Sequence, residues 1–142
     1  NISYIGGTSF LAVSDSALFY LGTDGEESTR YSFNERFLSG YEITDNGSCI
    51  LNFKSISDSS NQTEIIGRNG KLKGSYSSDN EVTSIDVKNN NILLTYENSA
   101  RIISIRGNKI RDINYGRELE NVYFIGRNKI LLLGKSEVKI IR

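Results

Sequence analysis

Four apolar runs recur along the chain at nearly equal spacing, and this repeat constrains the fold more than any other feature of the sequence. The runs start at Phe10, Cys49, Ile92 and Ile130, which lie 39, 43 and 38 residues apart. A polar or glycine-containing turn precedes each run, as in "DNGS" and "KNNN", and a shorter apolar stretch precedes that turn. Self-similarity at such a fixed period is typical of folds built from stacked repeats.

Each repeat predicts three or four short β-strands joined by hairpin turns. Gly and Asn tolerate the positive φ that tight hairpins need, which explains why they are enriched between the apolar runs. The runs are short, rich in Ile, Tyr and Phe, and closely punctuated by turn residues. These properties favour strands over helices.

The hydrophobic pattern changes across each repeat. The second segment is apolar at nearly every position, as in "ILLTY" and "ILLLG", so both of its faces should be covered. The fourth segment alternates or turns polar, which suits an outer edge. This gradient is typical of a propeller blade, whose inner strands lie between neighbouring blades. We therefore predict an all-β, β-propeller-like fold of about four short antiparallel blades, the last one incomplete, in a single domain over residues 1–142.

The predicted repeats cover approximately residues 2–36, 37–80, 81–117 and 118–142. The fourth repeat holds only three predicted strands, whereas four complete blades would need about 160 residues. We therefore expect a fragment of a larger ring, an open arc whose uncovered blade edges favour self-association. A self-closed four-bladed ring is the alternative.

The repeats resemble those of quinoprotein-like and WD-repeat β-propellers. The segments "ALFYLGTDGE" and "TEIIGRNGK" are similar to the strand, turn and Asp/Asn-Gly pattern of the quinoprotein-like repeats. The chain has no Trp, so it lacks both the Trp-Asp pair of WD repeats and the tryptophan-docking motif of quinoproteins, and no quinone cofactor is implied. A fainter resemblance, carried by the Asn, Ile, Lys and Ser bias, is to membrane-anchored propeller proteins of clostridial bacteria. That resemblance implies an extracytoplasmic location at a bacterial cell surface.

Missing residue types exclude several kinds of chemistry. The chain has no His, which excludes Ser-His-Asp and Cys-His nucleophile systems and His-ligated metals. Its single cysteine, Cys49, excludes an internal disulfide and is expected to be a small buried hydrophobe. The acidic turn at Asp24, Glu26 and Glu27 lacks the alternating ligand spacing of a calcium loop. We predict no catalytic residue, no metal and no cofactor.

Charge and hydropathy limit the partners. The 17 basic and 17 acidic residues balance, so we expect no nucleic-acid partner. No run of 18 or more apolar residues is present, so we expect no membrane span in this segment.

Tyrosines provide the candidate binding residues. Four of them sit inside strand patterns and are expected to pack in the core or between blades: Tyr4, Tyr20, Tyr96 and Tyr123. The other four lie at edges or turns, where a binding face could use them, although packing is the alternative there. These candidate binding-face residues are Tyr31, Tyr41, Tyr76 and Tyr115.

The sequence therefore favours a non-enzymatic binding or scaffold module that presents propeller loops to a protein or glycan partner. Propellers also host enzymes, so a carbohydrate-active enzyme using Asp/Glu and Tyr is a second hypothesis. A pocket holding two carboxylates and a Tyr would favour it. A third hypothesis is a purely structural half-ring.

Overall fold

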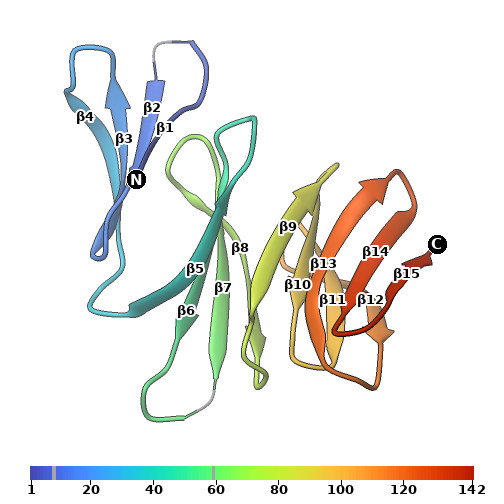
Figure 1. Cartoon of the computed structure of the whole chain (residues 1–142). Helices are drawn as coiled ribbons and strands as arrows, with labels where there is room; N and C mark the ends of the chain where they lie inside the picture. Colours follow the sequence, from blue (N-terminus) through green and yellow to red (C-terminus); the bar gives the residue numbers. More distant parts are fainter. Residues whose placement is uncertain (8, 59) are drawn as a thin grey trace.

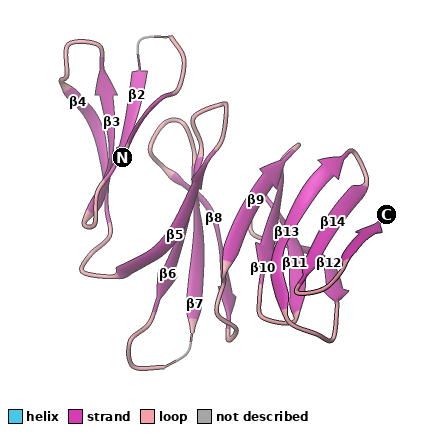
Figure 2. Ribbon diagram, in the orientation of Figure 1, coloured by secondary structure: helices cyan, strands magenta, loops and turns pink. Residues whose placement is uncertain are grey.

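The computed structural model describes residues 1–7, 9–58 and 60–142, which form fifteen β-strands in four antiparallel sheets (Figure 1). No helix occurs in these described ranges, as Figure 2 shows. The first two sheets comprise β1 (Ile2–Tyr4), β2 (Ser9–Val13), β3 (Ala17–Gly22) and β4 (Glu27–Ser32), then β5 (Phe37–Ile43), β6 (Cys49–Lys54), β7 (Asn61–Ile66) and β8 (Leu72–Ser78). The other two comprise β9 (Ser84–Lys88), β10 (Asn91–Thr95), β11 (Ser99–Ser104) and β12 (Lys109–Asn114), then β13 (Leu119–Gly126), β14 (Lys129–Gly134) and β15 (Val138–Ile141).

Within each sheet the strands follow one another in chain order, so each hydrogen-bonded pair is a hairpin. We call these sheets blades 1 to 4. The first strands of blades 2, 3 and 4 lie against one another, because β9 contacts both β5 and β13. They are the inner strands, and β8 and β12 are the outer strands of their blades. This arrangement confirms the predicted all-β fold of about four short antiparallel blades, of which blade 4 has three described strands.

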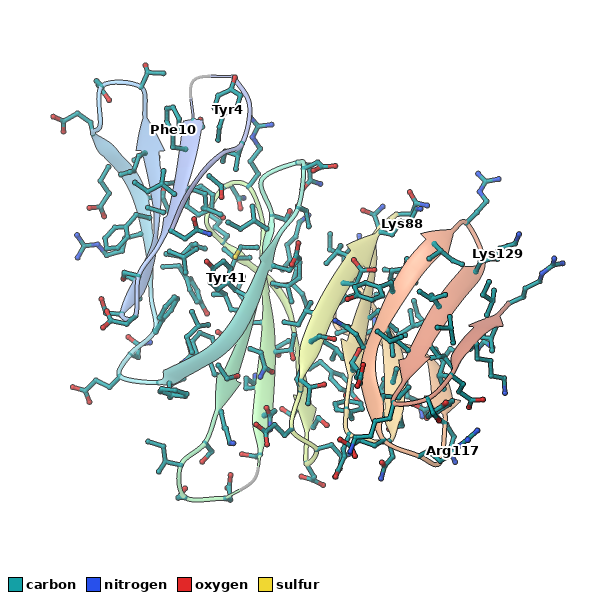
Figure 3. The ribbon with its side chains drawn as sticks, viewed as in Figure 1. Tyr4, Phe10, Tyr41, Lys88, Arg117 and Lys129 are labelled. Carbon is teal, nitrogen blue, oxygen red and sulfur yellow. The ribbon has the colours of Figure 1, made fainter. Side chains whose placement is uncertain are left out.

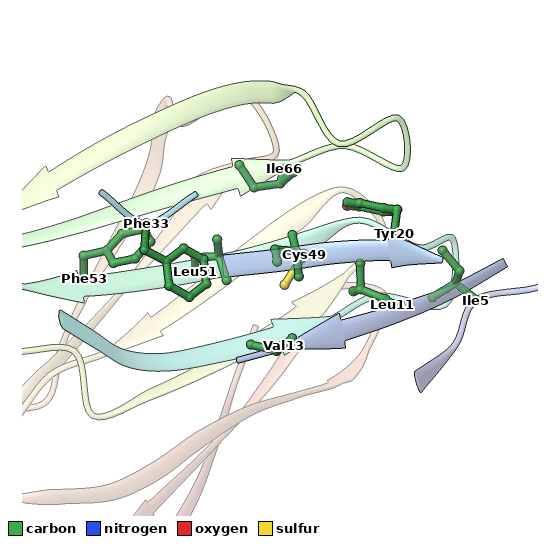
Figure 4. Packing of buried hydrophobic residues seen from close by; sticks show 10 residues of the cluster. Ile5, Leu11, Val13, Tyr20, Phe33, Cys49, Leu51, Phe53 and Ile66 are labelled. Carbon is green, nitrogen blue, oxygen red and sulfur yellow. The ribbon is translucent and has the colours of Figure 1, made fainter. Parts of the chain in front are cut away.

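Apolar clusters join each blade to the next. The first cluster packs Leu11 and Tyr20 of blade 1 against Leu51 and Phe53 of blade 2 (Figure 4). The second and third clusters lie between blades 2 and 3 and between blades 3 and 4. Their central residues are Ile50, Ile65, Ile92 and Ile103 in the second, and Leu93, Ile102, Val122 and Leu132 in the third. Blades 2 and 3 therefore bury both faces, which is the stacking expected of a propeller.

Burial follows the predicted gradient from the second strand to the fourth in blades 2 and 3. The prediction that the "ILLLG" segment is covered on both faces is wrong for the described residues, because β14 alternates between buried and half-buried positions. β6 is buried at every position from Cys49 to Phe53, and β10 is buried from Ile92 to Thr95. β12 is exposed at every position except Ile113. In blades 2 and 3 the second strand has a strand on each side and a blade on each face, which is why it is buried throughout and mostly apolar.

The two kinds of turn lie at opposite ends of the blades. Hairpins between first and second strands, and between third and fourth strands, lie at the upper end in Figure 1, which we call the hairpin end. The remaining hairpins and the connections between blades lie at the lower, connector end. Asn89 and Asn90 close the β9–β10 hairpin with φ of 52° and 65°. Asn tolerates this left-handed conformation, as the "KNNN" turn predicted.

Third-to-fourth hairpins lie directly on the outer strand of the preceding blade. In the β11–β12 hairpin, Gly107 has φ of 87°, and a Cβ there would overlap the carbonyl oxygen of Ser75 in β8. In the β7–β8 hairpin, a Cβ on Gly70 would overlap the side chain of Thr29 in β4. Glycine at these turns therefore allows close approach between blades as well as the turn itself.

The predicted packing of four tyrosines is right for two of them and wrong for the other two. Tyr20 and Tyr96 are buried, whereas Tyr4 is 64% exposed and Tyr123 is 41% exposed. The exposed pair belongs to blades 1 and 4, which have a neighbouring blade on one side only within the described residues. Both side chains lie on the face of their blade that no other described blade contacts, which is why they are exposed.

Candidate binding site

The structure distributes the four candidate binding-face tyrosines over the joints between blades. Each is half-buried and packs at the margin of an apolar cluster: Tyr31 and Tyr41 at the first, Tyr76 at the second and Tyr115 at the third. The Tyr41 hydroxyl accepts a 2.8 Å hydrogen bond from the Asn1 amide. The four hydroxyls therefore do not converge on one surface, and a role for them in partner binding stays a prediction.

Three of these tyrosines make a bond that recurs from joint to joint. In each case a tyrosine in the fourth strand, or directly after it, bonds a charged side chain of the next blade. The hydroxyl meets a carboxylate at the first and third joints and a guanidinium at the second. The pairs are Tyr31 with Glu64, Tyr76 with Arg101, and Tyr115 with Glu137.

The first of these bonds is part of a buried charge cluster. The side chain of Glu64 is 9% exposed and lies 2.9 Å from Arg36. The Tyr31 hydroxyl donates to Glu64 over 2.7 Å, and burial together with this bond raises the pKa of Tyr31. The guanidinium of Arg36 also stacks 4.0 Å above the ring centroid of Phe53. Every charged group here has a partner, so the cluster joins blades 1 and 2 and leaves no group free for a ligand.

An open cavity of about 450 Å³ lies at the hairpin end between blades 2 and 3. The β5–β6 and β9–β10 hairpins form its walls, and Figure 3 shows Lys88 at this end of the molecule. Ile43, Val87 and Ile105 supply the apolar part of the lining. The polar part consists of Glu42, Thr44, Asp45, Asn46, Lys88, Asn89 and Asn90. We call this the hairpin cavity.

The hairpin cavity offers both hydrogen-bond donors and acceptors. Burial raises the pKa of Glu42, and the nearby charge of Asp86 raises it further. Asp86 itself accepts a 2.7 Å hydrogen bond from the backbone N–H of Phe124 in blade 4. Neither Asp45 nor Lys88 takes part in an ion pair within the described ranges, and both are exposed. Their charges are therefore available to a partner.

Sequence reasoning missed this cavity because it treated each turn separately. The residue types of "DNGS" and "KNNN" predict turns and nothing further. The two segments occupy the same position in successive repeats, however, and stacked repeats bring equivalent turns to one end. That equivalence was the available signal.

A second cavity, of about 550 Å³, lies at the connector end of blade 3. It is lined by Glu81, Tyr96 and Glu97 together with Asn, Ser and Thr side chains. Glu81 is exposed and lies 3.1 Å from the ammonium group of Lys54. This cavity contains the two carboxylates and the tyrosine that the carbohydrate-active hypothesis requires. We call it the connector cavity.

Neither the surroundings of the single cysteine nor the grouping of the acidic residues indicates a catalytic or metal-binding site in the described residues. Cys49 lies in the first cluster, where burial raises its pKa from the ordinary 9.0 to about 12. A thiol with so high a pKa is a poor nucleophile at neutral pH. Within residues 1–7, 9–58 and 60–142, no three Cys, Asp or Glu residues are grouped as a metal site would need.

The stacked antiparallel sheets, three of four strands and one of three, define the chain as a β-propeller-type protein. The sequence model of the family of unknown function DUF5711 matches residues 1–142, and the chain belongs to that family. A comparison with curated proteins finds none that matches.

Solved structures with similar folds are propeller domains and a protein of unknown function. The WD40 domain of Neurospora crassa Pan2 has 8% sequence identity and a TM-score of 0.69, with 98% of this chain and 48% of that chain covered. BBS1N in its complex with ARL6DN has 10% identity and a TM-score of 0.64, with 93% and 42% covered. A Bacteroides caccae protein of unknown function has 13% identity and a TM-score of 0.56, with 95% and 56% covered.

At these identities the likeness shows the fold and nothing of the chemistry. It supports the resemblance to WD-repeat propellers at the level of architecture. The chain spans about half the length of these solved chains. Among the residues that the structure describes, no helix is long and apolar enough to cross a membrane.

Proposed function

We propose that the chain is a non-enzymatic binding module and that its hairpin cavity receives a segment of a protein partner. The observation that carries this proposal is that one open cavity is lined both by Asp45 and Lys88, which form no ion pair in the described residues, and by apolar side chains. Extended peptides are bound by such a combination, because backbone groups need donors and acceptors while side chains need apolar contact. Loops held by a rigid scaffold are also where binding residues concentrate.

The comparisons support a protein partner in preference to a glycan. Solved BBS1N, a structure with a similar fold, is a complex with the protein ARL6DN. The hairpin cavity also lacks an aromatic side chain, and aromatic faces are the usual stacking platforms for flat or ring-shaped ligands. The experiment that follows would also detect a glycan ligand.

The test is a selection of peptides from a random display library, run beside a glycan array, with the purified chain as bait. Selected peptides are then titrated against the Lys88→Glu variant. Because the variant reverses one of the two free charges in the cavity, we expect affinity to fall by about tenfold or more, which corresponds to roughly 1.4 kcal/mol.

The matched control is Asp79→Lys, which changes an exposed charge near the connector end. It should leave affinity unchanged. Selected ligands that bind Lys88→Glu and the wild type equally well would contradict the hairpin cavity as the site. Selection of glycans alone would contradict the protein partner.

A carbohydrate-active enzyme is the second candidate, because the connector cavity holds two carboxylates and a tyrosine. A glycosidase acid needs burial to raise its pKa, and both Glu81 and Glu97 are exposed. Glu81 is also held 3.1 Å from the ammonium group of Lys54. Saturable hydrolysis of any member of a panel of aryl glycosides, abolished by Glu97→Gln, would establish this candidate and overturn the non-enzymatic proposal.

The proposal includes an extracytoplasmic location at a bacterial cell surface, for which the Asn, Ile, Lys and Ser bias is the support. Protease digestion of intact cells that express the full-length gene product tests it. Loss of the propeller segment while the cells stay intact would support the location, and full protection would contradict it. A purely structural role is the remaining alternative, which binding that depends on Lys88 would exclude.

A further inference from the structure

Basic side chains gather at the hairpin end of blades 2 and 3, although charge balances over the whole chain. At the connector end of blade 2, Lys54 lies 3.1 Å from Glu81 and is paired with it. At the hairpin end, the β7–β8 and β11–β12 hairpins contain no acidic residue and carry four exposed cations that belong to no ion pair in the described part of the chain. We call these four residues the basic row: Arg68, Lys71, Lys73 and Arg106.

The basic row is continuous across the joint between blades 2 and 3. The Lys73 side chain passes over Gly67, beside Arg68, where a Cβ on the glycine would lie 3.2 Å from the Cε of the lysine. The backbone of Arg106 lies against Gly74, the residue after Lys73, so closely that a Cβ on this glycine would overlap the Arg106 carbonyl oxygen. The two hairpins therefore place their positive charges side by side.

The basic row adjoins the hairpin cavity on its outward side. Ile105 lines the cavity and directly precedes Arg106, and the Ile105 N–H donates a 3.0 Å hydrogen bond to the carbonyl oxygen of Asn90 in the cavity wall. Arg68 passes beside the β5–β6 wall, where a Cβ on Gly47 would lie 3.3 Å from the Arg68 Cγ. A chain that leaves the cavity toward the outer strands therefore meets the row.

The guanidinium of Arg68 has donors to spare. It donates a 3.4 Å hydrogen bond to the carbonyl oxygen of Gly6 in blade 1. A guanidinium carries five N–H donors in a planar fork that matches the two oxygens of a carboxylate. This one bond to blade 1 orients the side chain and leaves other donors for an anionic group.

We propose that the segment received by the hairpin cavity is an acidic stretch of a protein, whose carboxylates contact the basic row while its apolar side chains enter the cavity. The inference rests on the proposed function, because it requires that the cavity bind a peptide. Clusters of basic side chains are a recurrent means of recognising acidic motifs. The cavity's own carboxylates, on Glu42 and Asp45, both belong to the β5–β6 hairpin and its flanking strand, so the acidic residues of the segment lie on the outward side.

An acidic peptide fits the basic row better than a broad polyanion such as a bilayer or a nucleic-acid duplex. The β7–β8 hairpin lies on β4, where Gly70 approaches Thr29, so the β3–β4 hairpin borders the row. This bordering hairpin carries exposed Asp24 and Glu26. A broad anionic surface would lie over these acids and be repelled, whereas a single chain can follow the row alone. The hairpins around the row and the cavity also hold no aromatic side chain on which bases could stack.

The first test is the composition of the peptides selected from the display library, which should be enriched in Asp and Glu. The tightest peptide is then synthesised and titrated by fluorescence anisotropy against Lys73→Glu and Arg106→Glu. Each variant places a like charge against the peptide, so we expect affinity to fall by about tenfold. Wild-type affinity should also fall as salt is added, because the row is exposed and its charges are screened.

The matched control is Lys139→Glu, which makes the same change of net charge at an exposed cation of β15 that belongs to no ion pair in the described ranges. It should leave affinity unchanged. All three side chains are exposed, so each variant should keep the circular dichroism spectrum and thermal midpoint of the wild type. An equal loss of affinity in Lys139→Glu would overturn the inference, because it would indicate general charge attraction in place of a defined row.

The outcomes separate this inference from the proposed function. Neutral peptides that require Lys88 but bind Lys73→Glu and Arg106→Glu as tightly as the wild type would overturn the inference and leave the proposed function standing. Acidic peptides that lose affinity in both row variants but not in Lys88→Glu would support the row and contradict the hairpin cavity.

Two further probes address the other polyanions. They are vesicles of phosphatidylglycerol and phosphatidylcholine in equal parts, and a short DNA duplex, both at physiological ionic strength. We expect the acidic peptide to bind more tightly than either. Tighter binding of the vesicles or of the duplex that is lost in Arg106→Glu would overturn the assignment of the row to a protein partner.

Discussion

A tyrosine hydroxyl bonds a charged side chain of the next blade at each of the three joints. Tyrosine suits both a binding face and packing between blades, so residue type alone does not separate these roles. The place of Tyr31 in an outer strand predicts an accessible side chain. Its hydroxyl instead donates a hydrogen bond to Glu64 of the next blade. The sequence did not identify this partner, because Glu64 lies 33 positions further along the chain.

Replacing Glu64 by Ala should lower the free energy of unfolding by about 2 kcal/mol. The change leaves the Tyr31 hydroxyl and the Arg36 guanidinium half-buried without their acceptor, and an unpaired buried group costs more than the bond contributes. Urea unfolding monitored by circular dichroism measures it. The control is Glu27→Ala, which breaks an exposed pair with Arg30 at 2.9 Å and should change stability little. Equal effects of the two substitutions would contradict a buried role for Glu64.

The Cys49 thiol should not react with iodoacetamide at neutral pH until the chain unfolds. Burial raises its pKa to about 12, so almost no thiolate forms in the folded state. The unfolded thiol ionises near its ordinary 9.0, so the contribution of this group to stability is complete below that pH and is lost as pH rises to about 12. Mass spectrometry after labelling with and without urea checks the first statement. Rapid labelling of the folded chain would contradict it.

At the scale of strands and turns, local sequence carried most of the information. The runs at Cys49 and Ile92 were predicted as strands covered on both faces, and β6 and β10 are buried on both faces. Turn residues such as Asn89 and Asn90 adopt the left-handed φ that their type predicted. Short-range steric rules decide these features, so no knowledge of distant contacts was required. The second role of Gly107, which is contact with a neighbouring blade, depends on a distant segment and was not predictable.

Gly107→Ala should destabilise the chain by about 3 kcal/mol, against about 1 kcal/mol for Gly25→Ala. Both glycines have positive φ, of 87° and 79°, so both substitutions strain the backbone. Only the Cβ on Gly107 would overlap another blade, whereas the Cβ on Gly25 meets nothing within 4 Å. The difference in urea midpoint between the two variants isolates the contact between blades 2 and 3. Midpoints that agree would show that the β11–β12 hairpin does not pack on β8.

At the scale of the whole molecule, the blades form a linear stack in which each contacts only its neighbours. The stability of such a stack is close to a sum of blade and joint contributions. Blades 2 and 3 take part in two joints each, and blades 1 and 4 take part in one within the described residues. The single-domain assignment to residues 1–142 stays a prediction.

Native-state hydrogen exchange should therefore show a gradient along the stack. Amides in β6 and β10 should exchange through global unfolding, while those in β2 and β14 should exchange through smaller openings with a lower free energy. Exchange monitored at low urea concentrations measures both quantities. Uniform protection along the chain would indicate one cooperative unit in place of a stack.

The sequence by itself determined the period of the repeat, the strands within it, the chemistry of the turns and the exclusion of His-dependent catalysis. These depend on residue type and on interactions between close neighbours in the chain. Only the tertiary structure decided which faces meet, which tyrosine bonds which charge, and which turns from separate repeats enclose a cavity. The hydrophobic pattern of a strand predicts that one of its faces is buried. Which segment packs on that face depends on contacts between residues dozens of positions apart.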